Sequence, residues 1–549
     1  MKKVLEADVL CVGGGIAGLM AAIRASDQGA KVIVAEKGNT LRSGAGAAGN
    51  DHYFCYMPEI HGSDMKAAIA EWRKWLVGGK IAARRSKEFV HTLFERSYDI
   101  VKLWDSWGIP MKFHGKYEFA GHAFPGGPLM QLKYSGQNQK PVLTKQAKKR
   151  GIQIVNRVMV FDLLAADGCV SGAVAIDTRD DRLVEFRTKS VVLGTGTCVR
   201  LYPGPTPGWM SNLEWTFGLA GAGRAMAYRA GAELVDMEMP YRHAGPKYLA
   251  GIGKATWVGV LRDPQGKPVG PFLTAPSRKH GDVAGDVYQT VFEDYAKSGR
   301  GPVYMDCRGI SDEDYEYMTY WLEQEGNLAL LDHMKDERID PRKHRVEFMT
   351  YGMNRGGGLF YNERCETSVK GLYAAGDEFG SGMTTASVFG WEAGDSAAKY
   401  ARERTESLEK GLDGIEERER LLDSIRSREV GPGWREANIA LQQVMYDHAG
   451  PVRSETLLKT GLNHVRRLKD KARNSLVARN QHELMRCLEV LDLIDLGELV
   501  CLMALDRKET RSGHIRPDYP FANPLLQDKL HVIRRADDIP AQEWWDIVR

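Results

Sequence analysis

The chain has 549 residues, enough for two or three domains that each bury their own hydrophobic core. Its 75 lysines and arginines nearly balance its 72 aspartates and glutamates, so the net charge of +3 favours neither nucleic-acid binding nor attachment to an anionic membrane. The sequence has no run of about 18 uncharged apolar residues, and its first residues lead directly into a predicted strand. We therefore expect a cytoplasmic protein with no direct membrane insertion.

The segment that determines the fold class lies near the amino terminus. Val9–Val12 is a short apolar strand pattern, and Ile16–Gln28 is an alanine-rich segment of helical character. Glycines between them would allow a tight turn, close approach of a pyrophosphate and close packing of helix on strand. The free N–H groups at the start of the helix would bind the phosphates. The residues expected to make these contacts are Gly13, Gly15, Ile16, Ala17 and Gly18.

An acidic residue ends the second predicted strand. Glu36 follows the run Lys31–Ala35, about 20 residues after the glycines, where a carboxylate can accept hydrogen bonds from a ribose 2′-hydroxyl. This position favours FAD or NAD over NADP, and Lys37 directly after it is included among the expected cofactor contacts. The alternative is a glycine-rich turn with no ligand, which the following segments make less plausible.

Two further glycine-rich segments follow. Arg42–Asn50 contains too many glycines for a helix or an ordinary strand. Much later, Gly371–Asp377 has the pattern of a strand that ends in a glycine turn with an acid. Because a second glycine turn suited to a ligand appears so late in the chain, we expect the two turns to contact different parts of one long cofactor.

These three segments together resemble the flavoprotein subunits of the fumarate reductase and succinate dehydrogenase superfamily. Within it, the strongest likeness is to the alpha subunit of adenylylsulfate reductase. Most of the chain takes part, because further segments match in the same order: Trp107–Pro110, Gly115–Tyr117, Lys140–Lys148, Val192–Gly196, Gly301–Asp306 and Glu509–Arg516. The resemblance implies an α/β fold with a Rossmann-like FAD-binding domain, an inserted α+β capping domain and a C-terminal helical domain.

The expected domain boundaries follow from segment order and composition. Residues 1–240 and 346–402 would form the FAD-binding domain, and residues 241–345 the capping domain, which would exclude water from the flavin. Residues 403–549 would form the helical domain and a tail, because apolar residues at helical spacing predict three helices at 436–447, 454–472 and 480–505. The tail, 519–549, is expected to be extended and to wrap either its own FAD-binding domain or another subunit.

By the same resemblance the cofactor is FAD. Arg42–Gly49 would line the flavin, Gly194–Gly196 would cross beneath the cofactor, and Asp377 would lie beside the ribityl chain. Gly44 stands where the succinate and fumarate enzymes have a histidine that bonds to the flavin, so we expect non-covalent FAD. The full set of expected cofactor-binding residues is Gly13, Gly15, Ile16, Ala17, Gly18, Glu36, Lys37, Arg42, Ser43, Gly44, Ala48, Gly49, Asn50, Met159, Gly194, Thr195, Gly196, Gly376, Asp377, Ser387 and Val388.

The substrate side departs from the resemblance. Met353 stands near the position of a histidine that both the dicarboxylate enzymes and adenylylsulfate reductase use for their substrates. The segment Gly380–Ser387 replaces a stretch that contains an arginine in the dicarboxylate enzymes, and it has none. The arginine-rich substrate loop of adenylylsulfate reductase corresponds only loosely to Tyr241–Lys247. We therefore do not expect turnover of fumarate or succinate, and the substrate stays open.

Reactions at a flavin need a cation or donor near the accepting atom and an acid that returns a proton. Arg355 is the first candidate for the cation, because it lies in a glycine-rich loop expected at the flavin face. The other candidates are Arg242, His243, Tyr351, Asn354 and His514. A salt-bridged or solvated role is the alternative for each of the loop residues. For His514 the alternative is a buried ion pair that joins the terminal helices to the core.

The eight cysteines are scattered and contain no Cys-x-x-Cys pair, which indicates neither an iron–sulfur cluster, nor a zinc site, nor a disulfide framework. No metal site is therefore expected in this chain. Electrons would have to come from another molecule, and the resemblance implies an iron–sulfur, ferredoxin-like partner subunit. Formation of an oligomer stays open.

These inferences together predict an FAD-dependent oxidoreductase. It would transfer a hydride or an electron pair between flavin N5 and a small-molecule substrate, and would exchange electrons with the iron–sulfur partner. One alternative is an adenylylsulfate reductase alpha subunit, which interconverts AMP, sulfite and adenylylsulfate. Another is a non-catalytic electron-transfer flavoprotein subunit, which would need no substrate-sized cavity beside the flavin.

Overall fold

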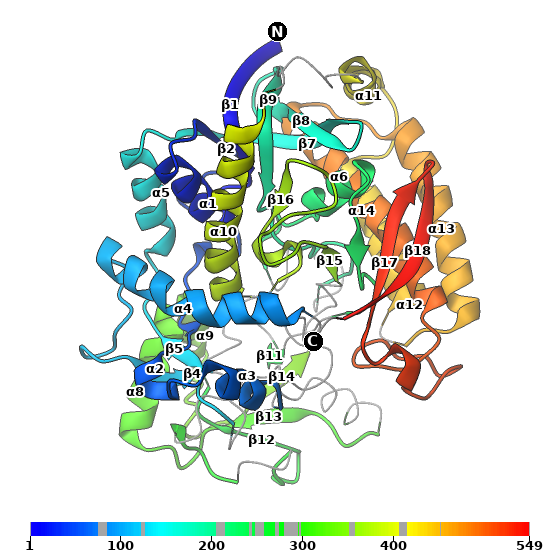
Figure 1. Ribbon diagram of the computed structural model, residues 1–549. Coiled ribbons are helices and arrows are strands. Elements are labelled where there is room, and N and C mark those ends of the chain that lie inside the picture. Colours follow the sequence, from blue (N-terminus) through cyan, green and yellow to red (C-terminus); the bar gives the residue numbers. More distant parts are fainter. Residues whose placement is uncertain are drawn as a thin grey trace.

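The structure is a computed structural model. It describes residues 2–74, 85–121, 127–204, 215–240, 244–247, 257–269, 274–278, 295, 298–350, 357–380, 382–405, 414–450 and 452–547. Figure 1 shows a central sheet with helices packed against it, a smaller α+β region below it and a layer of carboxy-terminal helices at one side. Among the described residues, no helix combines the length and the apolar composition that crossing a bilayer would require.

A seven-stranded sheet forms the core of the predicted FAD-binding domain. Its strand order is β6-β2-β1-β9-β8-β7, and β16 pairs with β9. The pairs among β6, β2, β1, β9 and β16 are parallel, whereas β8 and β7 are antiparallel additions. The strands are β1 (Lys2–Val12), β2 (Val32–Glu36), β6 (Gln153–Asn156), β7 (Val158–Ala166), β8 (Cys169–Asp177), β9 (Leu183–Leu193) and β16 (Leu372–Ala374).

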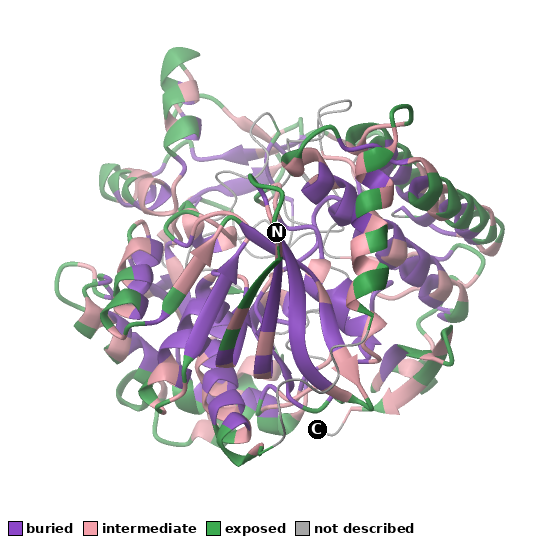
Figure 2. Ribbon diagram, turned by 90° about the horizontal axis from the view of Figure 1, so that it is seen from above, coloured by how far each residue is buried: buried purple, intermediate pink, exposed green. Residues whose placement is uncertain are grey.

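Small residues let two helices pack closely on this sheet. A Cβ on Gly390 of α10 (Gly382–Glu403) would lie 2.5 Å from the carbonyl oxygen of Ala17 in α1 (Ile16–Asp27). The helix α5 (Gln139–Lys149) lies on the same side of the sheet (Figure 1). Figure 2 shows that most of the central strands are buried, whereas the start of β1 and much of the surrounding helices and loops are exposed.

The parallel strands bring three distant glycine turns to one edge of the sheet. Val12 pairs with Leu193, and Leu193 pairs with Ala374, so β1, β9 and β16 end at the same level. The turn that follows each strand therefore lies beside the other two. In doubly wound sheets the ligand lies outside this carboxyl edge, and the register explains why segments so far apart in sequence share one site.

The capping region is an α+β layer, as predicted. Its four-stranded antiparallel sheet has the order β11-β14-β13-β12 and packs on two helices around Trp257, Trp321 and Phe348. The elements are β11 (Ala244–Pro246), β12 (Val260–Arg262), β13 (Val303–Asp306), α8 (Asp312–Gln324), α9 (Leu328–Asp336) and β14 (Val346–Thr350).

A small sheet and three helices connect the FAD-binding domain to the capping region. The sheet has the order β3-β5-β4. The elements are β3 (His52–Phe54), α2 (Pro58–His61), α3 (Met65–Lys74), α4 (Lys87–Trp107), β4 (Glu118–Gly121) and β5 (Gln131–Lys133), and the short helical turn η1 (Ala45–Ala47) precedes β3. Two other short helical turns lie elsewhere: η5 (Gly376–Glu378) follows β16, and η6 (Pro524–Leu526) precedes the last two strands of the chain.

The three helices expected in the carboxy-terminal region are present, and another described helix precedes them. They are α11 (Ile415–Ser427), α12 (Trp434–Ala449), α13 (Glu455–Ser475) and α14 (Gln481–Asp506). The central helix α14 is buried around most of its surface, because it packs on α12, α13 and α6 (Ala222–Arg229) of the FAD-binding domain. The helical domain is therefore joined to the cofactor-binding core over a broad area.

The tail is not simply extended, because much of it forms a β-hairpin. Strands β17 (Lys529–Ala536) and β18 (Ile539–Asp546) join β10 (Leu234–Val235) and β15 (Gly358–Leu359) in a sheet with the order β15-β10-β17-β18. The tail therefore wraps its own chain, which is one of the two outcomes expected from the sequence. β10 and β15 lie close in sequence to the two ends of the capping region, so the hairpin holds the place where the chain enters and leaves it.

A buried charge network fixes this hairpin. Arg507 contacts Asp236 at 3.0 Å, Glu238 at 2.5 Å and Glu509 at 2.7 Å, and all four side chains are almost fully buried. His531 of β17 lies between Glu238 and Asp506. Although burial opposes its protonation, these carboxylates raise the pKa of His531 to about 9. The ring is therefore charged at neutral pH and adds a second cation to the network.

Candidate functional site

A cavity of ≈ 510 Å³ lies at the carboxyl edge of the parallel strands. All three glycine turns contribute to it, together with the segment after β2 and the start of α10. The expected cofactor-binding residues that line the cavity are Gly13, Gly15, Ile16, Ala17, Glu36, Lys37, Arg42, Ser43, Gly44, Met159, Gly194, Thr195, Gly196 and Asp377. A long cavity between strand ends and helix starts has the form that a dinucleotide needs.

Gly13 and Gly18 of the first glycine turn have no room for a side chain. Gly13 has a φ of +93°, and a Cβ there would lie 2.6 Å from the carbonyl oxygen of Gly194 in the second turn. Gly18 does not line the cavity. A Cβ on Gly18 would overlap the carbonyl oxygen of Gly13, so this glycine allows α1 to approach β1 closely. The free N–H groups of the α1 amino terminus therefore lie directly at the cavity wall.

Two backbone N–H groups hold the carboxylate of Glu36 in place. Its oxygens accept hydrogen bonds from the N–H groups of Gly14 and Gly38, each at 2.6 Å, and the side chain is 7% exposed. Lys140 of α5 is fully buried and donates to the carbonyl oxygen of Gly14. Burial lowers the pKa of this lysine to about 8, against the opposing attraction of Glu36. The first turn is thus anchored on both sides before any ligand binds.

The donors and acceptors of the cavity fit FAD. Ser43 Oγ and Asp377 Oδ1 are buried and have no hydrogen-bond partner within the described part of the chain. A ligand with hydroxyl groups along a ribityl chain would satisfy such atoms, and leaving them unpaired would be costly. The charged lining residues Lys37, Arg42 and Arg157 also suit a diphosphate.

Other residues expected to bind the cofactor lie outside this cavity. These are Gly18, Ala48, Gly49, Asn50, Gly376, Ser387 and Val388. The Ser387 hydroxyl is hydrogen-bonded with the Tyr53 hydroxyl at 2.6 Å, and Val388 is completely buried in the core. Gly376 packs between Ala17 and Ala386, whereas Gly49 faces the carbonyl oxygen of Gln324 in the capping region. Their cofactor contacts stay predictions.

Most of the candidate catalytic residues cannot be placed. Arg242, His243, Tyr351, Asn354 and Arg355 lie outside the described residues, and so does Met353.

The structure does describe His514, which is fully buried and does not line the cavity. Its Nδ1 is 2.9 Å from Arg453 Nη1, and its Nε2 is 3.1 Å from the carbonyl oxygen of Arg507. Burial, reinforced by Arg453, lowers the pKa of His514 well below its usual value. These contacts favour the structural alternative, in which His514 joins the terminal segment to the core.

The sequence reasoning missed one wall of the cavity. Arg157 and Phe217 line it, and so do three residues of α14: His482, Met485 and Arg486. A usable signal was present, because 482, 485, 486 and 489 follow the spacing of one helix face and include polar residues in a mostly apolar helix. The sequence-based prediction of this helix used only its apolar face and did not consider the polar one.

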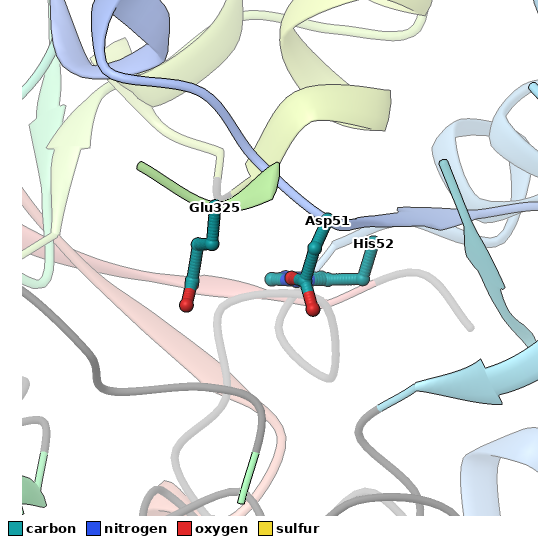
Figure 3. Close-up of side chains that lie close together, drawn as sticks. All are labelled: Asp51, His52 and Glu325. Atoms are coloured by element: carbon teal, nitrogen blue, oxygen red, sulfur yellow. The ribbon is translucent and has the colours of Figure 1, made fainter. Parts of the chain in front are cut away.

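A cluster of potential metal ligands lies where the capping region meets the FAD-binding domain. Asp51, His52 and Glu325 offer ligand atoms within 4.8 Å of one another (Figure 3). However, Lys133 Nζ is 2.6 Å from Asp51 Oδ2, and neither side chain is exposed. An ammonium in this position already supplies the cation that the carboxylate needs. We therefore interpret the cluster as an interdomain charge contact.

Backbone contacts around this cluster hold the capping region close to the flavin-side loop. Gln137 Nε2 donates to the carbonyl oxygen of Glu323 at 2.7 Å. A Cβ on Gly326 would overlap the carbonyl oxygen of Ala48. The turn between α8 and α9 therefore lies against the loop that follows Gly46.

Family comparisons agree with this architecture. Residues 8–388 match the FAD binding domain family, and residues 438–540 match the fumarate reductase flavoprotein C-terminal family. The chain belongs to the fumarate reductase flavoprotein family. Like its relatives, it is an FAD-dependent oxidoreductase.

Individual relatives cover nearly the whole chain. A fumarate reductase (CoM/CoB) subunit of Methanothermobacter marburgensis is 26% identical over 97% of this chain and 98% of its own length. The adenylylsulfate reductase structure from Archaeoglobus fulgidus has a TM-score of 0.84 at 20% identity and covers 100% of this chain and 97% of that one. The Escherichia coli quinol fumarate reductase flavoprotein has a TM-score of 0.82 at 20% identity, with the same coverage. The two structures show a shared fold.

Proposed function

We propose that this flavoprotein transfers a hydride or an electron pair between FAD and a small-molecule substrate bound under the capping region. The observation that carries the proposal is the cavity that reaches from Glu36 to the amino terminus of α10. Gly44 and Met383 also line the cavity, and Gly44 belongs to the loop against which the capping region packs at Gly49. A substrate between these surfaces would be shielded from water.

The residues of the chain would bind and orient the cofactor. The N–H groups that begin α1 would bind the diphosphate, Glu36 would accept from the adenosine ribose, and Asp377 would accept from the ribityl chain. The amino terminus of α10 would stabilise negative charge on the ring system through its unpaired N–H groups. When bound, FAD supplies the two-electron carrier that no side chain can provide.

The α10 amino terminus argues against a dicarboxylate substrate. Thr384 donates to the carbonyl oxygen of Phe54, and the residues from Gly382 to Ser387 include neither arginine nor lysine. A segment without a cation cannot neutralise a carboxylate by a bidentate pair. Although several relatives are named fumarate reductases, we therefore propose a substrate other than fumarate or succinate.

The electrons are proposed to come from an iron–sulfur, ferredoxin-like partner subunit in the cytoplasm. All eight cysteines are free thiols, and every one except Cys169 is buried, which suits core packing. Some of the relatives are named as subunits of fumarate reductases, which supports a multi-subunit assembly.

The FAD is expected to be released completely by acid precipitation. Gly44 has no side chain that could bond to the flavin, and its φ of +85° disfavours most other residues. The absorbance of flavin should therefore appear entirely in the supernatant. A pellet that stays yellow and fluoresces on a denaturing gel would contradict non-covalent binding.

Reduced protein should be reoxidised without oxygen by a small molecule as well as by a protein partner. The test is to copurify the native complex, identify the companion polypeptide, reduce the flavin anaerobically, and follow its absorbance after adding candidate oxidants. Fumarate is expected to fail and serves as the matched negative control.

The alternative functions predict different changes in flavin absorbance in the same experiment. Bleaching of the oxidised flavin by sulfite with AMP would support the adenylylsulfate reductase alternative. Reoxidation by the protein partner alone, with every small molecule inactive, would support a non-catalytic electron-transfer subunit. Rapid turnover of fumarate would contradict the interpretation of the α10 amino terminus.

A further inference from the structure

One wall of the cofactor cavity comes from the helical domain. His482, Met485 and Arg486 of α14 line the cavity, facing a fold whose glycine turns lie far earlier in the sequence. Their spacing of three and four residues puts them on one face of the helix. The site is therefore incomplete without the carboxy-terminal domain.

A fully buried carboxylate ties this wall to the FAD-binding domain. Glu489, one turn beyond Arg486, contacts Lys37 at 2.5 Å, Arg200 at 2.8 Å and Arg486 at 2.8 Å. Although burial opposes ionisation, these three cations lower the pKa of Glu489 to about 2. One carboxylate thus holds three cations, and the surplus positive charge faces the cavity through Lys37 and Arg486.

The network lies at the adenosine end of the cavity. Lys37 directly follows Glu36, whose carboxylate is held for a ribose hydroxyl, and its Nζ also donates to the carbonyl oxygen of Gly218 at 2.6 Å. Gly44, which is expected to face the flavin, also lines the cavity, and so does Met383 at the start of α10. The residues of α14 are therefore linked to the half of the site that would hold AMP.

One N–H donor of Arg486 has no hydrogen-bond acceptor among the residues that the structure describes. Its guanidinium lies 4.8 Å from the ring centroid of Phe217, and the guanidinium of Arg200 lies 4.4 Å from the same ring. Phe217 lines the cavity as well. The Nε of Arg486 is buried and has no hydrogen-bond partner in the described part of the chain. A buried guanidinium N–H without an acceptor is costly, and a phosphate or a purine nitrogen would satisfy it.

We propose that α14 is part of the FAD site and binds the AMP half of the cofactor through Arg486 and the face that includes His482 and Met485. Glu489 acts as a positioning residue, because it fixes Arg486 and Lys37 across the domain boundary. FAD would then hold the helical domain against the FAD-binding domain. FMN lacks the AMP half, so contacts with α14 would not contribute to its affinity.

The proposal predicts a selective loss of affinity in Arg486→Ala of the full-length chain. Apoprotein would be titrated with FAD, ADP and FMN by calorimetry or by quenching of flavin fluorescence. Loss of a charged hydrogen bond to the ligand should weaken FAD and ADP about 10- to 100-fold, whereas FMN binding should not change. Arg467→Ala is the matched control, because Arg467 is exposed on α13 and does not line the cavity.

Each result of this titration decides the proposal. Wild-type affinity for FAD and ADP in Arg486→Ala would overturn it. An equal loss for FMN would also overturn it, because the effect would then be general damage to the site. These are binding measurements, so they stand whether or not the proposed substrate reaction is correct.

Hydrogen exchange of the unmutated protein gives an independent test that needs no stable variant. Removing FAD should increase exchange at the start of α14, residues 481–490, far more than in α13, residues 455–475. Adding ADP to the apoprotein should restore the protection, and adding FMN should not. Equal exchange of 481–490 with and without FAD would overturn the proposal.

Discussion

Gly13→Ala is expected to yield a protein that binds FAD about 100-fold more weakly. The left-handed backbone of Gly13 costs an alanine about 1–2 kcal/mol. Its Cβ would also lie 2.6 Å from the carbonyl oxygen of Gly194, and such overpacking adds roughly 1–3 kcal/mol. Because both atoms belong to the cavity wall, relief of the clash must separate the two turns that hold the diphosphate. The ratio of flavin to protein absorbance after purification, followed by FAD titration, measures the effect.

Gly29→Ala is the matched control for this variant. Gly29 has a similar φ of +85°, but a Cβ there would meet nothing within 4 Å. The position follows the other end of α1, away from the cavity. This variant should lose a little stability and keep its FAD. If Gly13→Ala retained FAD as well as Gly29→Ala, the close approach of the two glycine turns would not be required for binding.

Arg507→Met should destabilise the protein by about 3–5 kcal/mol, because it leaves buried carboxylates unpaired. Arg507 is the shared partner of Asp236, Glu238 and Glu509, and none of these side chains is more than 2% exposed. The hairpin β17–β18 should detach first, since it depends on the same network through His531. Urea unfolding would measure the loss, and limited proteolysis within residues 529–546 would report the release of the hairpin.

Arg535→Met tests whether the effect depends on burial. Arg535 lies on the same hairpin and pairs with Asp538 at 2.7 Å, but the two side chains are 38% and 85% exposed. Ion pairs of this kind contribute at most about 1 kcal/mol. A similar destabilisation in both variants would mean that the burial of the Arg507 network is not the reason for its importance.

Local patterns predicted many of the secondary elements. The apolar strand at Val9–Val12 and the helix after it are present as β1 and α1, and the three predicted carboxy-terminal helices lie within a few residues of α12, α13 and α14. Helical periodicity and glycine turns report on the nearest few residues, which is why these predictions succeeded. The hairpin in the tail was not predicted, because its strand β17 pairs with β10, about 300 residues earlier.

For the site, motif reasoning reached only the residues close to the glycine turns. Glu36 is the last residue of β2, Thr195 and Asp377 follow the ends of β9 and β16, and all three line the cavity. No sequence motif points to Arg486, because its role depends on how α14 packs against Lys37 and Phe217. A helical face with mixed polarity indicates that the face contacts another part of the molecule, but which residues it contacts depends on how the domains pack.

The sequence by itself indicated a long nucleotide cofactor, because its glycine-rich segments have the pattern of turns in which only glycine fits against a neighbouring backbone. It also predicted the order of the domains. The tertiary structure alone decided that the helical domain forms one wall of the cavity, that the tail fastens the entrance to the capping region, and that His514 belongs to a buried network. Such contacts join residues hundreds of positions apart, and their energies depend on burial and register, which no local pattern contains.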